Sequence, residues 1–251
     1  MIYGTYLSAT GIAQAQAKQD VIANNLANAE TVGFRRLITL HKQRDASPGG
    51  PESLENRTGG SISLPTRLDT SPGGLEQTNR PLDVALVGDG YLTVRKDTPT
   101  GPETYLTRDG RMTLDGDRRI VLVNDPTAVV LGRDAQPLTV PTDVAESSLV
   151  LDEDGNLMGR DGTAVGHIRT ATVSDPTRLK PIGGGLFDAA EPLIDAPSSS
   201  MRSGFIETSN VDPTLELTRM IRVARQLEAN ANLIRHQDTT LGRLIEASAI
   251  A

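Results

Sequence analysis

The sequence predicts an α+β protein in which N- and C-terminal helices form a coiled-coil-like helical domain with an inserted antiparallel all-β domain. Three observations support this fold class. Near both ends of the 251-residue chain, mainly apolar residues recur at steps of three and four, as in amphipathic helices. Short β-branched runs alternate with turn signals every ~8–12 residues between them, as in antiparallel sheets. Only 3% of residues are aromatic, so any core must be aliphatic.

The first helix is predicted over residues 3–29, which contain no proline. A narrow stripe near the 3.5-residue period of a coiled-coil seam runs along it. Its members are Ile12, Ala15, Gln19, Ile22, Leu26 and Ala29. Gly33 then ends the pattern, as a glycine beyond a helix usually does.

The second helix is predicted to begin at Asp212-Pro213, because Asp can cap a helix and Pro is tolerated at the first helical position. The same rhythm continues for roughly 30 residues, and only Asp238 interrupts it. The stripe comprises Leu217, Met220, Ala224, Leu227, Ala231, Ile234, Leu241 and Ile245. Two interpretations stay open: a helix that packs on partner helices, which the long, narrow stripe favours, or an ordinary surface helix.

The composition divides the chain into three kinds of segment. Residues 1–44 and 205–251 are predicted to form a discontinuous helical assembly domain, because neither amphipathic helix would be stable alone. Residues 45–80 hold Pro- and Gly-rich clusters and are predicted to be a connector with extended segments, such as 61–64. Residues 81–204 are predicted to be a β-rich outer domain.

The sequence offers no catalytic constellation. There is no cysteine, which excludes disulfides, thiolate metal sites and a cysteine nucleophile. The three histidines form no i, i+4 pair, and no nucleotide-binding or nucleophile motif occurs. Residues 152–156 resemble the start of a calcium loop but lack its later glycine and glutamate, so a hairpin turn is predicted. We therefore expect no enzyme activity, catalytic residue, cofactor, metal or small-molecule substrate.

Charge and hydropathy argue against a nucleic-acid partner, a membrane-spanning helix and a secretory signal peptide. The net charge of −7 and the few aromatics argue against nucleic-acid binding. No apolar run is long enough to span a membrane. The N-terminus lacks the basic region and the uninterrupted apolar stretch of a secretory signal peptide.

Three asparagines, Asn24, Asn25 and Asn28, lie near the end of the first predicted helix. Asparagine is a poor residue inside helices, because its side chain competes for backbone hydrogen bonds. One interpretation is a helix end that frays into a capped turn. The other is that these amides satisfy backbone groups of neighbouring subunits and set their register.

Several motifs resemble those of one family, the bacterial flagellar rod and hook axial proteins. Residues 22–35, IANNLANAETVGFR, resemble its N-terminal signature, and 204–234 resemble its C-terminal signature. Between them, residues 79–85, NRPLDVA, precede GDGY at 88–91, and YLTRDG occupies 105–110. These motifs stand in the family's order along nearly the whole chain. Within the family, SPGGLEQTNRPLDVALVGDGYL and the short length resemble the proximal-rod member most, then the distal-rod member, then the longer hook protein.

The resemblance implies a structural subunit of the flagellar basal-body rod, the periplasm-spanning drive shaft used for motility. It implies that the terminal helices polymerise into an inner coiled-coil layer beneath an outer β-domain. The implied partners are copies of the chain itself, other rod, hook and basal-body proteins, and the flagellar type III export apparatus, with export needing no cleaved signal peptide. The alternatives are a hook or hook-junction subunit and, from another class, a secreted cell-wall-associated β-domain binding module.

We expect the subunit interface to use residues of the two predicted helices and of the two signatures. These are Ile22, Asn24, Asn25, Leu26, Asn28, Gly33, Phe34, Asn210, Met220, Ala224, Leu227, Asn230, Ala231, Ile234 and Leu241. They combine the apolar stripes with the asparagine and glycine positions of the signatures.

Overall fold

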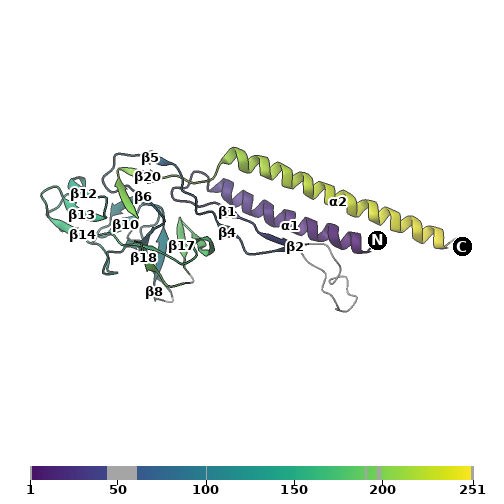
Figure 1. Ribbon diagram of the computed structural model, residues 1–251, viewed down its shortest axis with the longest axis horizontal. Coiled ribbons are helices and arrows are strands. Elements are labelled where there is room, and N and C mark those ends of the chain that lie inside the picture. The colour runs from purple at the N-terminus through teal and green to yellow at the C-terminus, as the bar shows by residue number, and fades with distance from the viewer. Residues whose placement is uncertain (1, 44–60, 100, 190, 197–198, 250–251) are drawn as a thin grey trace. The chain divides into compact units, whose positions relative to one another are not determined.

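Two long helices from opposite ends of the chain lie side by side in the computed structural model (Figure 1), which describes residues 2–43, 61–99, 101–189, 191–196 and 199–249. The chain divides into two compact units. The first comprises Met1–Ala27, Leu37–Arg67 and Asp212–Ala251, and the second comprises Asn28–Arg36 and Leu68–Val211. The predicted α+β class, with terminal helices and an inserted antiparallel β region, is confirmed.

The helices of the first unit begin and end close to where the sequence places them. They are α1, Ile2–Ala27, and α2, Pro213–Ala249. Asp212 caps α2 as predicted, because its Oδ1 accepts hydrogen bonds from the amides of Thr214 at 2.9 Å and Leu215 at 3.1 Å. Neither helix combines the length and the apolar character needed to cross a membrane, among the residues that the structure describes.

The two helices pack antiparallel along a narrow apolar seam. Ala15 and Ile22 of α1 and Val223 of α2 are buried there, with Met220 and Leu227 packed against them. At Gly4 and Gly11 the helices come so close that an added Cβ would lie within 3 Å of the Gln237 and Asn230 side chains respectively. Glycine and alanine therefore set the spacing of the pair.

Two residues of the predicted α2 stripe lie outside the buried face. Ile245 is 66% exposed, and Leu217 is 48% exposed, whereas Glu216 beside it is buried. A straight α-helix has 3.6 residues per turn and drifts away from a strict 3.5-residue repeat. The buried face therefore passes through Glu216, Val223 and Leu227 and leaves Leu217 outside it.

Short strands accompany the helices in the first unit. They are β1, Leu37–Ile38, β2, His41–Gln43, and β3, Ser61–Ser63. β2 and β3 pair antiparallel, with His41 opposite Ser63, so the extended segment expected near 61–64 is present. β4, Arg67–Leu68, lies where the chain passes from the first unit to the second. Residues 45–60 of the predicted connector lie outside the described residues.

The second unit is built from short strands. They are β5, Leu75–Gln77; β6, Val84–Val87; β7, Tyr91–Thr98; β8, Gly101–Thr107; β9, Met112–Leu114; β10, Ile120–Leu122; β11, Ala128–Val130; β12, Leu149–Leu151; β13, Asn156–Gly159; β14, Ala164–His167; β15, Thr170–Thr172; β16, Lys180–Gly183; β17, Leu186–Asp188; β18, Ile194–Asp195; β19, Ser200–Ser203; and β20, Phe205–Glu207. Glu146–Ser148 and Pro176–Arg178 form 3-10 helices.

These strands pair antiparallel in several sheets. The largest runs β16-β17-β8-β7-β11-β10-β9, with β15 pairing to β7 and to β18. β12, β13 and β14 form a three-stranded sheet, β19 pairs with β6, and β20 pairs with β5. The turn at 152–156 joins β12 to β13, so the predicted hairpin is confirmed there.

The core of the second unit is mainly aliphatic, as the composition predicts. It contains Leu92, Val94, Ile120, Leu122 and Val130, which are nearly inaccessible to solvent, and it draws on strands of more than one sheet. Tyr91 and Phe187 add an edge-to-face aromatic pair with ring centres 5.8 Å apart. Burial of this apolar surface is the main stabilising contribution to the unit.

Gly110 gives a test of the close packing in this unit. A Cβ added there would lie 1.7 Å from the carbonyl oxygen of Val84, whose amide donates to the Gly110 carbonyl at 2.9 Å. We expect Gly110→Ala to lower the free energy of unfolding by about 2–3 kcal/mol, because two backbone segments must separate. Urea unfolding followed by circular dichroism measures this change.

Gly116→Ala is the matched control. No atom lies within 4 Å of a Cβ added at Gly116, so we expect a change below about 1 kcal/mol. Equal losses in the two variants would contradict the packing around Gly110.

Candidate functional site

The predicted interface residues of α2 occupy one half-buried line on the helix. Met220 and Leu227 pack in the seam with α1, and Asn230 lies close to Gly11. The remaining members of this line, Ala224, Ala231, Ile234 and Leu241, are also partly buried. In the isolated subunit, part of this line therefore already packs against α1.

The predicted residues of α1 fall into different environments. Ile22 is buried in the seam, Leu26 is partly buried and Asn24 is exposed. Asn25 is 1% exposed and holds the backbone of Leu37 at two points. Its Oδ1 accepts from the Leu37 amide at 2.8 Å, and its Nδ2 donates to the Leu37 carbonyl at 2.9 Å. The Asn25 amide thus pairs with its own chain.

Asn28 forms the turn that follows α1. Its carbonyl accepts from the Thr31 amide at 3.1 Å, and its Oδ1 accepts from the Thr31 hydroxyl at 3.2 Å. Both contacts are local, and they match the capped-turn interpretation of the asparagine cluster at this position. The turn leads directly into Gly33.

Gly33 packs directly against the backbone of the Arg108–Asp109 turn in the second unit, which is possible because glycine has no side chain. Its φ is 70°, which favours glycine. An added Cβ would lie 2.4 Å from the backbone between Arg108 and Asp109. Its amide donates to the Glu207 carbonyl at 2.8 Å, and the next residue, Phe34, is buried.

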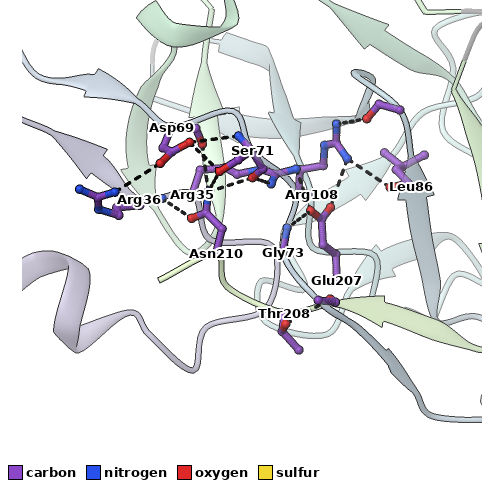
Figure 2. A network of polar contacts seen from close by, with 12 residues as sticks. Arg35, Arg36, Asp69, Ser71, Gly73, Leu86, Arg108, Glu207, Thr208 and Asn210 are labelled. Atoms are coloured by element: carbon purple, nitrogen blue, oxygen red, sulfur yellow. Dashed lines mark hydrogen bonds and ion pairs between the residues drawn. The ribbon is translucent and has the colours of Figure 1, made fainter. Parts of the chain in front are cut away.

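Asn210 joins three chain segments of the second unit (Figure 2). Its Oδ1 accepts from the Arg36 amide at 2.7 Å, and its Nδ2 donates to the carbonyls of Ser71 at 2.9 Å and Asp69 at 3.2 Å. Asp69 accepts from the Ser71 hydroxyl at 2.6 Å and pairs with Arg36 at 3.4 Å. Partial burial alone would raise the pKa of Asp69, but the Ser71 hydrogen bonds and the charge of Arg36 outweigh it and lower that pKa.

Glu207 lies at the centre of the network (Figure 2). Its side chain is 2% exposed, and its two oxygens face arginines from different segments. Oε1 lies 2.7 Å from Nη2 of Arg35 and accepts from the Gly73 amide at 2.9 Å. Oε2 lies 3.1 Å from Nη1 of Arg108. One buried carboxylate therefore joins two buried guanidinium groups.

Backbone carbonyls and one ring complete the surroundings of the two arginines. Arg35 donates to the carbonyl of Ser71, and Arg108 donates to those of Leu86 and Gly88. The Arg108 guanidinium also lies 4.9 Å from the centre of the Tyr91 ring, a cation–π distance. The strand ends at Leu86–Gly88 are thereby tied to the same cluster.

The buried charges of Arg35, Glu207 and Arg108 are stable only as long as each keeps its partner. Burial lowers the pKa of Arg35, and the charge of Glu207 opposes that shift. The Nε atoms of Arg35 and Arg108 are buried and have no hydrogen-bond partner among the described residues. Because burying an ion costs several kcal/mol, removal of one partner leaves an expensive uncompensated charge.

The network is suited to holding chain segments together rather than to chemistry. Its carboxylate is enclosed by two arginines and an amide, with no exposed acid–base pair beside it. No group of three or more His, Cys, Asp or Glu side chains in the described part of the chain could hold a metal ion. We call the set Arg35, Glu207 and Arg108 the charged junction.

The charged junction was not among the predicted site residues, although its members lie in the quoted motifs. Arg35 follows Gly33-Phe34, and Glu207 follows Gly204-Phe205-Ile206. A charged residue one or two positions after a Gly-Phe pair, once in each signature, is the signal that could have pointed to it. The pairing itself depends on the tertiary fold.

Both terminal segments of the chain match known protein families. Residues 6–35 match the family described as "Flagella basal body rod protein", and residues 202–247 match "Flagellar basal body rod FlgEFG protein C-terminal". The chain is 30% identical over 266 residues to the flagellar basal-body rod protein FlgG of Bacillus subtilis, covering 98% of each protein.

Sequence identity and coverage are similar for two FlgF proteins. The flagellar basal-body rod protein FlgF of Mesorhizobium japonicum is 32% identical over 234 residues, 92% of this chain and 91% of that protein. FlgF of Escherichia coli is 31% identical over 254 residues, 97% of each. The similarity therefore extends over both units.

Glu207→Gln tests the charged junction. The variant keeps the shape of the side chain but leaves two buried guanidinium groups without a carboxylate. We expect the free energy of unfolding of the second unit to fall by about 3–5 kcal/mol. Hydrogen exchange at the β7 and β8 amides, measured against urea concentration, reports this loss.

Asp195→Asn is the control, because Asp195 pairs with Arg169 at 3.1 Å but is 73% exposed. We expect that loss to be about 1 kcal/mol or less. If Glu207→Gln cost no more than the control, the charged junction would not stabilise the unit.

Proposed function

The chain belongs to the flagellar basal-body rod protein family, and we propose that it assembles into the rod through its two terminal helices. The family resemblance predicted from the motifs is confirmed. The protein is a structural subunit of the flagellar basal-body rod, and this family is non-enzymatic. The mode of packing and the specific neighbours form the proposal.

The composition of α1 is the observation that carries the proposal. Lys18 and Asp20 are its only charged residues among the 26 of the helix. The side turned away from the seam exposes alanines at positions 9, 13, 23 and 27. Gln16, Asp20 and Asn24 are also exposed on α1, but the small alanine side chains would let a second helix approach closely. A neighbouring subunit would supply that helix.

Exposed apolar side chains of α2 support the same packing. Leu215, Leu217, Ile221 and Leu233 are 45–56% exposed. At about 100° per residue, Leu217 and Ile221 lie on one flank of the helix, and Leu215 and Leu233 lie on another. Head-to-tail contacts between identical subunits that do not close into a ring generate filaments. Because these side chains are already half buried, their remaining burial against a neighbour would contribute about 1 kcal/mol each.

The predicted interface residues divide into three roles in this proposal. Asn24, Leu26 and the half-buried line of α2, from Met220 to Leu241, retain exposed surface that a neighbour can cover. A second group sets the path of the chain within the subunit through intramolecular contacts: Asn25, Asn28, Gly33, Phe34 and Asn210. Ile22 contributes to the seam that both helices need before they can assemble.

Family membership implies assembly with rod subunits and a place in the basal-body rod. We propose copies of this chain, other rod and hook proteins, and the flagellar export apparatus as its partners, with export that uses no cleaved signal peptide. The segments 1–44 and 205–251 are the proposed assembly domain and 81–204 the proposed outer domain. We also propose a position in the proximal rod.

A copy count in purified basal bodies tests the proposed position. Mass spectrometry with labelled peptide standards would compare this chain with the ring proteins of the same particles. A few copies per particle are expected for the proximal rod. Tens of copies would place it in the distal rod or hook, and absence from intact particles would overturn the assembly proposal.

Leu227→Asp tests the helix seam as the basis of assembly. The charge replaces a side chain packed against Val223 and the α1 residues, so we expect the helix pair to lose about 3 kcal/mol or more. The second unit should unfold as in the wild type, whereas rods should be absent and cells non-motile. Hydrogen exchange of α2 and electron microscopy of basal bodies give the two readouts.

Gln226→Asp is the matched control, because Gln226 is the exposed neighbour of Leu227 on α2. This variant should assemble normally. Normal rods from Leu227→Asp would rule out the seam as a requirement.

A further inference from the structure

The unpartnered face of α2 carries a short row of three side chains. Leu217 is 48% exposed and Ile221 is 56% exposed, and Arg225 is exposed one turn further along. Residues four apart lie on neighbouring turns of one helix face, so the three form a continuous ridge. We call Leu217, Ile221 and Arg225 the α2 ridge.

The exposed face of α1 carries a row of small and acidic side chains at helical spacing. Ala23 lies four residues before Ala27, and Asp20 lies three residues before Ala23. All three are exposed, and Asp20 forms no ion pair with any residue that the structure describes. We call Asp20, Ala23 and Ala27 the α1 face.

The orientation of the two rows follows from the helix pair. α1 and α2 run antiparallel within one subunit. In a filament of identical contacts, successive subunits keep the same direction. A neighbour's α2 that lies along α1 therefore also runs antiparallel to it. With Leu217 set beside Ala27 in that orientation, Ile221 would lie beside Ala23 and Arg225 beside Asp20.

We propose that the α2 ridge of one subunit packs against the α1 face of a second copy of this chain, with Arg225 paired to Asp20. This inference rests on the proposed function and names the contact that carries it. Large apolar side chains of the ridge lie over alanines, which allow the two helix backbones to approach closely. The opposite charges at one end set the register.

Charge and position on the helix favour Arg225 over its neighbour Arg222. Arg222 is also exposed, but it follows Ile221 directly and therefore points about 100° away around the helix. Arg225 continues the row of Leu217 and Ile221. The structure thus offers a matched residue of the same type at nearly the same level, outside the proposed contact.

Cross-linking with introduced cysteines tests the proximity of the two rows, because the natural chain contains no cysteine. Two differently tagged copies would be co-expressed in the source bacterium, one carrying Ala23→Cys and the other Ile221→Cys. Basal bodies would then be purified and mildly oxidised. We expect a reducible species that carries both tags, at twice the mass of one chain, since a disulfide requires Cα atoms within about 7 Å.

The control pairs Ala23→Cys with Arg222→Cys, which should give no linked species above background. If Ile221→Cys prevents assembly, Ala27→Cys with Leu217→Cys tests the same contact. Equal linking in both pairs, or none while both chains are present in the particles, would overturn the contact but leave the rod assignment intact. Absence of the unsubstituted chain from particles of the wild-type strain would overturn the proposed function and the contact together.

A charge exchange tests the register. Asp20→Arg and Arg225→Asp should each abolish or strongly reduce swimming in soft agar, and the double variant should restore it. Asp20→Arg combined with Arg222→Asp should not restore it. Swimming at the wild-type rate in both single variants, or rescue by Arg222→Asp as well, would overturn the pairing of Asp20 with Arg225.

Discussion

The negative charge of Glu207, placed between two buried guanidinium groups, is the constraint on which the second unit depends. In a poorly solvated interior, charged hydrogen bonds are strong when complete and costly when one partner is missing. The segments that carry Arg35, Glu207 and Arg108 must therefore meet in one arrangement. Gly33 and Gly73 make that meeting sterically feasible, because a Cβ at either position would overlap the opposing backbone.

The first unit depends on a different and weaker contact. Its seam is narrow, built mainly from Ala15, Ile22 and Val223, and it leaves large apolar side chains of α2 in solvent. An isolated amphipathic helix is marginal in water, and most of its stability comes from packing. In the proposed packing, the subunit would complete this burial only in the assembly, which links the modest seam of the isolated chain to the proposed polymerisation.

Local patterns allowed much of the fold to be predicted. The start of α2 at Asp212-Pro213, the end of α1 before Gly33 and the β12–β13 hairpin each depend on neighbouring residues. Side-chain placement was harder to predict. Leu217 was assigned to the buried stripe, but helical drift leaves it exposed. The amide of Asn25 was open to two interpretations, and its partner, Leu37, lies after a turn whose geometry the sequence pattern does not specify.

The sequence by itself determined the element types, the absence of cysteine chemistry and the family, because these follow from periodicity, composition and ordered motifs. Only the tertiary structure decided which charged groups are buried together and which helix faces stay in solvent. Arg35 and Glu207 stand at opposite ends of the chain, and their ion pair exists only once the intervening sheets have formed. The physical reason is that the cost of burying a charge depends on the groups around it in space, which no local pattern encodes.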